Sequence, residues 1–241
     1  MYSDSNLINY ERNYNFKDKF MDIPVIFKPK DPISALTHFI GMIGAIIMTP
    51  LLFIRAAQFN LEISSLISLM VFMLSMIFLY GASASFHSFN LSNRGNIILR
   101  KLDHTMISIL IAGSYTPICI MGLSRNVGIR LLIAIWVAAF ISAIFKLFWI
   151  NCPKYFSSVI YIAMGWMCVM VLPQLFHNIP LVSFVMLFVG GVLYSIGGVI
   201  YSLKFTLDNR VFKNFSSHDL FHVFVMLGSA CHFTCMYFMI G

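Results

Sequence analysis

Two histidines stand four residues apart in the segment HDLFH, at His218 and His222. At roughly 100° per residue, such a pair lies about 40° apart on one face of a helix. Neutral imidazole nitrogens are common zinc ligands, so the pair is a candidate for part of a metal site. HxxxH is nevertheless a weaker signal than HExxH, because ordinary helices carry it by chance. The pair indicates a metal only if other ligands lie at the same level.

Three further residues could complete such a site. The segment SASFH places the hydroxyl of Ser83 one helical turn before the imidazole of His87, and Asp103 occurs in another apolar segment. Three imidazoles from two helices, with an open fourth position, describe a zinc site of the catalytic type. In that site Asp103 could hydrogen-bond a bound water or offset the charge of the ion. Other polar residues that could contribute are His38, His104 and His232.

The composition places these residues in a membrane. Of the 241 residues, 59% are hydrophobic and 10% are charged, against roughly 25% charged in ordinary soluble domains. A bilayer core about 30 Å thick needs about 20 apolar residues per helix, and the chain has room for several. The net charge of +7 does not indicate nucleic-acid binding, because the basic residues are dispersed between apolar runs. The five cysteines form no zinc-ribbon or disulfide pattern.

The apolar runs predict an all-α, polytopic membrane protein, a bundle of seven transmembrane helices. The predicted spans are 33–57, 64–87, 103–123, 127–149, 157–176, 180–203 and 218–240. Residues 1–30 are polar and lack the apolar core of a secretory signal peptide. We expect them to form a cytoplasmic tail, followed by one membrane domain over residues 31–241.

The distribution of Lys and Arg predicts the orientation of the bundle, because cytoplasmic segments carry an excess of them. Seven spans put thirteen basic residues on the side of the N-terminus and three on the other: Arg55, Arg125 and Arg130. The N-terminus is therefore predicted to be cytoplasmic and the C-terminus outside, in the cell membrane. Five of the seven histidines then lie at the cytoplasmic face, and only His177 and His232 fall elsewhere.

Four segments at these positions resemble the hemolysin III branch of the progestin and adipoQ receptor family, which is itself similar to alkaline ceramidases. They are THFIGMIGA (37–45), YGASASFHS (80–88), KLDHTMISILIAGSYTP (101–117) and HDLFHVFVMLGSACHF (218–233). They extend over the chain from about residue 31 to its end, in family order.

The resemblance implies a seven-helix bundle in which three histidines bind zinc near the cytoplasmic side. Those histidines fall on His87, His218 and His222, the family aspartate falls on Asp103 and acts through a water, and the family serine falls on Ser83. In the first helix the family commonly has an acidic residue, then Asn, then His. Here Asp31, Ser34 and His38 stand in those places, so no role that needs an amide transfers to Ser34.

Two hypotheses about function lead. The first is a zinc-dependent hydrolase of a lipid amide or ester, in which Asp103 serves as base or orienter and Ser83 contacts the water or the developing oxyanion. The similarity to ceramidases implies a sphingolipid-like substrate by analogy, and another acyl lipid fits equally. The second is a non-enzymatic membrane-homeostasis factor or sensor with structural zinc. A pore-forming cytolysin is disfavoured because the chain is hydrophobic throughout. A transporter is disfavoured because the polar residues gather at one face.

Overall fold

The computed structural model describes residues 29–203 and 216–241. The predicted polar tail, up to residue 28, and the basic residues of segment 204–215 lie outside this range. Within the described residues the secondary structure is helical, without a strand. The helices are α2 (Pro32–Gln58), α3 (Ile63–Ser88), α4 (Asn93–Pro117), α5 (Arg125–Phe148), α6 (Lys154–Gly165), α7 (Leu172–Asn178), α8 (Leu181–Leu203) and α9 (Ser217–Met239), with a π-helical turn, Ile118–Gly122, and a 3-10 segment, Trp166–Val171.

Within residues 29–203 and 216–241, seven helical segments are long and apolar enough to cross a membrane, which agrees with the predicted number of spans. Six of them agree with the prediction to within three residues at either end. The segments are long because apolar side chains continue for more than the roughly 20 residues that a bilayer requires. The fold class predicted from the sequence is therefore correct.

The third span begins earlier than predicted. It starts at Asn93 instead of residue 103, and the hydroxyl of Ser92 caps it by accepting a hydrogen bond from the backbone N–H of Gly95. The added residues, NRGNIILRKL, contain three basic side chains and are too polar for a hydropathy criterion. A helix can extend beyond the hydrocarbon layer, so Asp103 lies within the helix and not at its start.

The fifth span is a continuous helix in the prediction but has a change of winding in the structure. The 3-10 segment Trp166–Val171 separates α6 from α7. The hydroxyl of Tyr115, from α4, donates to the carbonyl of Gly165 at 2.6 Å and accepts from the backbone N–H of Cys168 at 2.9 Å. One side chain from a neighbouring helix thus satisfies backbone groups where the regular helix ends, as irregular backbone in a membrane requires.

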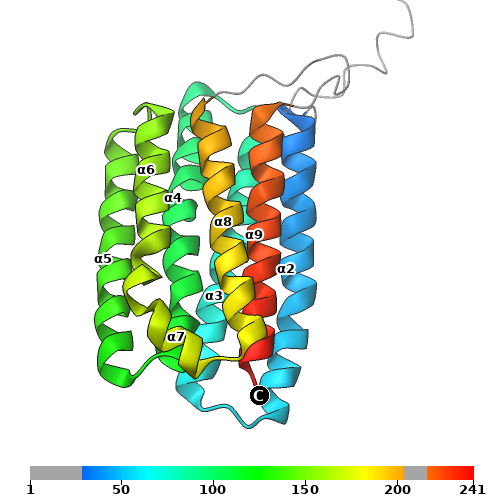
Figure 1. Ribbon diagram of the computed structural model, residues 1–241. Coiled ribbons are helices and arrows are strands. Elements are labelled where there is room, and N and C mark those ends of the chain that lie inside the picture. The colour runs from blue at the N-terminus through cyan, green and yellow to red at the C-terminus, as the bar shows by residue number, and fades with distance from the viewer. Residues whose placement is uncertain (1–28, 204–215) are drawn as a thin grey trace, which may run out of the picture.

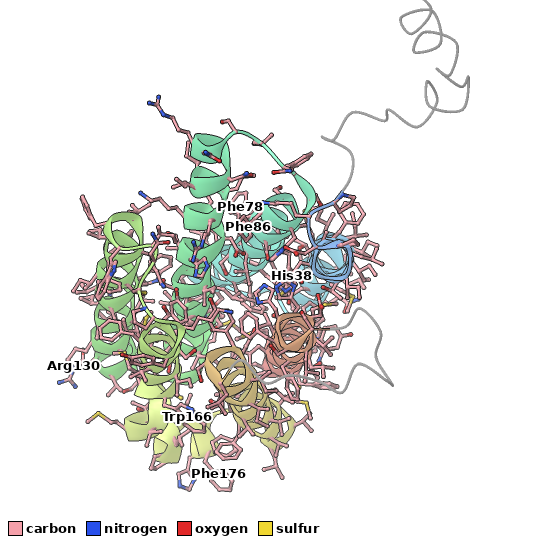
Figure 2. The ribbon with its side chains drawn as sticks, turned by 90° about the horizontal axis from the view of Figure 1, so that it is seen from above. His38, Phe78, Phe86, Arg130, Trp166 and Phe176 are labelled. Atoms are coloured by element: carbon pink, nitrogen blue, oxygen red, sulfur yellow. The ribbon has the colours of Figure 1, made fainter. Side chains whose placement is uncertain are left out.

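The long helices run side by side, as Figure 1 shows. Around the bundle, α2 contacts α3, α3 contacts α4, and α4 contacts α5; α6 packs against α8, α8 against α9, and α9 against α2. The helix α4 is the most buried of the spans. Figure 2 shows His38 between the helices and Phe176 at the periphery, where large apolar side chains are exposed as a lipid-facing surface requires.

Candidate metal centre

The structure brings His87, His218 and His222 together. His87 lies in the last turn of α3, and the other two lie in the first turns of α9. One ring nitrogen from each falls within 4.8 Å of the others, and His87 Nε2 is 3.2 Å from His218 Nε2. Two nitrogens on a tetrahedral zinc ion stand about 3.3 Å apart, given Zn–N bonds of about 2.0–2.1 Å. The donor set therefore fits a zinc ion, and the distance between the His87 and His218 nitrogens matches that of two ligands on one ion.

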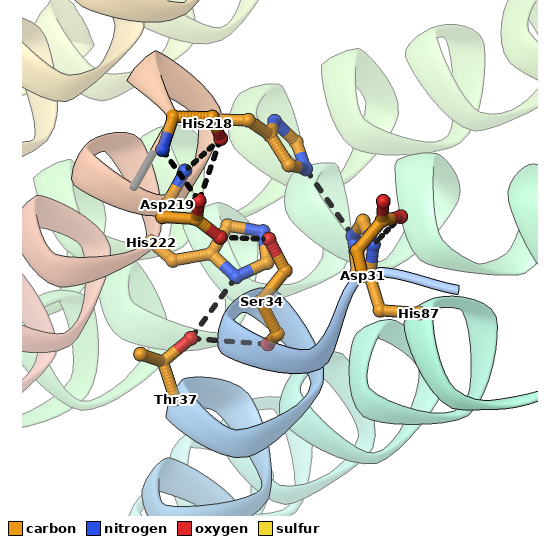
Figure 3. Close-up of polar contacts among 8 residues, drawn as sticks. Asp31, Ser34, Thr37, His87, His218, Asp219 and His222 are labelled. Carbon is orange, nitrogen blue, oxygen red and sulfur yellow. Dashed lines mark hydrogen bonds and ion pairs between the residues drawn. The ribbon is translucent and has the colours of Figure 1, made fainter. Parts of the chain in front are cut away.

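The start of α9 is fixed by its own sequence. Ser216 caps the helix: its hydroxyl accepts from the backbone N–H of Asp219 at 3.2 Å, and the Asp219 carboxylate accepts from the backbone N–H of Ser216 at 2.7 Å. This reciprocal capping box is a strong helix start. The other oxygen of Asp219 accepts from the hydroxyl of Ser34 in α2, at 2.5 Å (Figure 3). Asp219 thus both starts α9 and joins it to α2, which positions His218 and His222.

The Nδ1 atom of His87 has a carboxylate partner. Nδ1 lies 2.9 Å from Oδ2 of Asp31, and the backbone N–H of Asp31 donates to the carbonyl of His87 at 3.1 Å. An ionised carboxylate only accepts hydrogen bonds, so Nδ1 of His87 carries the proton. The lone pair is then on Nε2, which faces the other histidines. A carboxylate behind a histidine in this way is the usual outer partner of a metal ligand.

A hydroxyl plays the equivalent part for His222. The Thr37 hydroxyl donates to the carbonyl of Ser34 at 3.0 Å and lies 3.4 Å from Nδ1 of His222 (Figure 3). Since its proton is directed at the carbonyl, the hydroxyl accepts from Nδ1–H of His222. That leaves the lone pair of His222 on Nε2. Two of the three histidines are therefore held in the tautomer that a metal ligand needs.

Asp103 and Ser83 lie beside the histidines without joining the group of ligand atoms. Both are buried and line the same cavity as His218 and His222. Asp103 is near enough to His87 and Ser83 to interact with them, and Arg100 and Lys30 place positive charge in its surroundings. The Ser83 hydroxyl makes no hydrogen bond of ordinary geometry within the described residues. A carboxylate and a free hydroxyl thus stand next to the candidate ligands.

The other predicted polar residues occupy different positions. His38 stacks on His222, with ring centroids 3.6 Å apart and an angle of 4° between the planes, and it lies outside the group of ligand atoms. The backbone carbonyl of His104 accepts from the Tyr161 hydroxyl at 2.9 Å. His232 lies deeper in α9 and lines the same cavity as the HxxxH pair. His38, His104 and His232 all line the cavity.

The cavity has a volume of about 120 Å³ and changes character along its length. Histidines and Asp103 line one end, and the walls beyond them come mainly from apolar side chains and glycines of α4, α6, α8 and α9. Representative residues there are Ile107, Leu110, Ile162 and Gly191. At about 1.5 Å per residue, the lining of α4 from Asp103 to Tyr115 spans about 18 Å. An elongated, mainly apolar space therefore leads away from the polar end.

Sequence reasoning missed the contacts of Asp31, Thr37 and Asp219. Asp31 directly precedes a proline at the start of the first helix, and Asp219 is enclosed within HDLFH, so both positions carry a visible helix-start signal. No pattern in the chain connects Asp31 to His87 or Thr37 to His222. Those contacts depend on the rotation of whole helices, which the sequence pattern does not specify.

Comparisons with known proteins agree on one family. The family described as "Haemolysin-III related" matches residues 27–233. A protein of Bacillus subtilis strain 168 named "Hemolysin-3 homolog" is 33% identical over 214 residues, which are 88% of this chain and 96% of the relative. A protein of Bacillus cereus named "Hemolysin-3" is 33% identical over 212 residues, which are 88% of this chain and 92% of the relative. No solved structure gives a significant match. The chain therefore belongs to the haemolysin-III related family of multi-pass membrane proteins.

Proposed function

We propose that this protein is a zinc-dependent membrane hydrolase that cleaves a lipid amide or ester. The observation that carries the proposal is the convergence of three imidazoles at the polar end of an elongated apolar cavity. The apolar space could receive an acyl chain, and the polar end could receive the group to be cleaved. Ligand sites commonly combine apolar walls with a few convergent polar groups in this way.

His87, His218 and His222 would hold the ion. When bound, zinc acidifies a coordinated water and polarises a carbonyl oxygen. Asp103 would accept the proton that the attacking water releases, because its carboxylate lies near His87 and Ser83. The Ser83 hydroxyl would donate a hydrogen bond to the oxygen that gains negative charge, since it is buried beside Asp103 and makes no hydrogen bond of ordinary geometry within the described residues. Asp31 and Thr37 would keep two of the histidines in their ligand tautomers.

The test is release of fatty acid from a broad panel of lipid amides and esters by purified protein that contains zinc. Asp103→Asn removes the base and leaves all three histidines in place. We expect it to retain its zinc and to lose about 10²- to 10⁴-fold in rate, the range typical of a general base. Failure of the wild-type protein to release fatty acid from any member of the panel would refute the hydrolase.

The same three histidines also support a non-enzymatic function, in which zinc joins α3 to α9 in a membrane-homeostasis factor or sensor. In that case Asp103→Asn has no effect on cellular function, while His87→Ala lowers stability and zinc content together. An asparagine variant that keeps its zinc and its full cellular function would favour this second candidate over the hydrolase.

We also propose that the histidine end faces the cytoplasm of the cell in whose membrane the protein resides. Arg94, Arg100, Lys101, Lys146 and Lys154 lie towards that end, and three arginines lie towards the other. The expected result is an outside location for a reporter fused after Gly241. A cytoplasmic reporter at that position would reverse the orientation.

A further inference from the structure

A second polar group stands deep in the apolar part of the cavity. His232 follows His222 by ten residues along α9, which corresponds to about 15 Å at 1.5 Å per residue. Its side chain is buried, with 8% of the residue exposed. It lines the main cavity and also a smaller cavity next to it. A polar side chain at this depth in a membrane protein raises a functional question.

Neither ring nitrogen of His232 has a hydrogen-bond partner within the described residues. The carbonyl of Leu187 lies near the ring but outside hydrogen-bond geometry, and pairing with it would still leave one nitrogen unmatched. A neutral imidazole offers one donor and one acceptor. A buried donor and acceptor without partners lower stability. The two ring nitrogens of His232 therefore indicate that a ligand binds here.

The neighbouring polar groups already have partners, which distinguishes them from His232. The Tyr194 hydroxyl is 2.7 Å from the hydroxyl of Ser229, and the Ser114 hydroxyl donates to the carbonyl of Ile111 at 2.8 Å. The Tyr115 hydroxyl is occupied by the backbone at the end of α6. His232 therefore supplies the unmatched hydrogen-bonding capacity in this part of the cavity wall.

The imidazole of His232 is held in place by α8. A Cβ atom at Gly190 would lie 2.3 Å from Cδ2 of His232, so the ring occupies space that only a glycine leaves open. The ring of Tyr194 packs against it edge to face, with centroids 5.2 Å apart. By contrast, Cβ atoms at Gly165 and Gly191 would meet nothing within 4 Å, and both glycines line the cavity. A fixed donor and acceptor thus stand beside open space.

We propose that His232 binds a hydroxyl or oxo group in the middle of an acyl chain whose carbonyl end lies at the candidate metal centre. The inference rests on the proposed function and names a substrate class for it: lipids with a chain oxygenated near its middle. Each C–C bond of about 1.5 Å advances an extended zigzag chain by only about 1.25 Å, so the chain covers the roughly 15 Å between the two sites in about twelve bonds. A hydroxyl matches both the donor and the acceptor of a neutral imidazole.

The experiment measures binding and requires no turnover. Wild-type protein in detergent, loaded with zinc, is titrated with octadecanoic acid, 12-hydroxyoctadecanoic acid and 2-hydroxyoctadecanoic acid, as analogues of the released product. We expect the 12-hydroxy acid to bind about tenfold more tightly than octadecanoic acid, since one hydrogen bond to a buried, otherwise unmatched group is of that order. The 2-hydroxy acid should not reproduce the gain, because its hydroxyl lies far from His232.

Variants test whether His232 is the cause. His232→Leu should reduce the preference to less than about twofold while octadecanoic acid still binds, and His232→Gln, which restores a donor and an acceptor, should keep part of it. His177→Leu, at an exposed histidine in α7 outside the cavity, should keep all of it. If the Leu variant does not fold, the Gln variant and the comparison of the 12- and 2-hydroxy acids in the wild type still decide the question.

Failure of this inference can be distinguished from failure of the hydrolase. Equal binding of the three acids by the wild type, or an undiminished preference in a folded His232→Leu protein, would overturn the role of His232 and leave hydrolysis unaffected. A preference for the 12-hydroxy acid that depends on His232 would support the inference even if no lipid in the panel releases fatty acid, in which case only the hydrolase is refuted.

Discussion

The two ends of the bundle use polar side chains differently. At the end opposite the histidines, Arg55 donates from Nε to the backbone carbonyls of Tyr237 and Ile240, at 2.7 and 3.1 Å, and Asn178 donates to the carbonyl of Gly122 at 3.1 Å. These side chains donate hydrogen bonds to the last backbone carbonyls of helices, which otherwise lack partners. At the histidine end the polar atoms face one another across a shared space.

This difference shows what distinguishes a candidate site from structural polarity in a membrane protein. Seven described residues have buried side-chain nitrogen or oxygen atoms without a partner, and five of them line the large cavity: His38, Ser83, His104, Ser158 and His232. Buried polar groups are normally paired. Unpaired groups that gather around one cavity therefore indicate a ligand more strongly than the number of polar residues does.

Removal of a candidate ligand should have the largest effect on zinc binding. We expect His218→Ala to weaken zinc binding by more than the roughly 10- to 100-fold that loss of an outer partner costs, because two imidazoles then remain where three converged. Competition with a zinc chelator measures the change. Arg55→Ala, which removes a polar side chain at the opposite end, should keep full affinity for zinc. Equal losses in the two variants would mean that the two ends do not differ.

A smaller effect is expected from the outer partner of His87. Asp31→Asn keeps the size of the side chain but removes the charge that holds Nδ1–H of His87. We expect about a tenfold loss of zinc affinity, at the lower end of the usual range, because Asp31 is more than half exposed. The same titration of Glu62→Gln, at the other end of α3, should show no loss. An unchanged affinity in Asp31→Asn would show that the Asp31 carboxylate does not support zinc binding by His87.

The smallest effect should come from the hydroxyl that contacts His222. Thr37→Val keeps the shape of the side chain and removes an acceptor at the long distance of 3.4 Å. A loss of about threefold in zinc affinity corresponds to one weak hydrogen bond. Thr49→Val, in the same helix, removes a hydroxyl that donates to the carbonyl of Ala45 at 2.8 Å, and serves as the control. If the two valine variants are alike, Thr37 does not orient His222.

The spans were predictable because long apolar runs leave few alternatives in a bilayer. The start of α4 was not predictable from hydropathy, because the basic residues 94, 100 and 101 interrupt the apolar run. The helix nevertheless begins at Asn93, where the side chain of Ser92 caps it. The location of His87, His218 and His222 at one membrane face followed from topology, because alternate span ends meet there. Their approach to within 4.8 Å depends on helix packing. Asp31 and Thr37 were out of reach because their contacts depend on helix rotation. The isolation of His232 depends on the partners of Tyr194 and Ser114, which only the packed structure reveals.

Metal analysis of the purified protein tests whether His87, His218 and His222 form a zinc site. Wild type and His222→Ala are purified side by side without added metal, with His177→Ala as a control that removes a histidine outside the cavity. We predict about one zinc ion per chain in the wild type and in His177→Ala, and almost none in His222→Ala. Wild-type protein without zinc, or His222→Ala with as much zinc as the wild type, would contradict the zinc site.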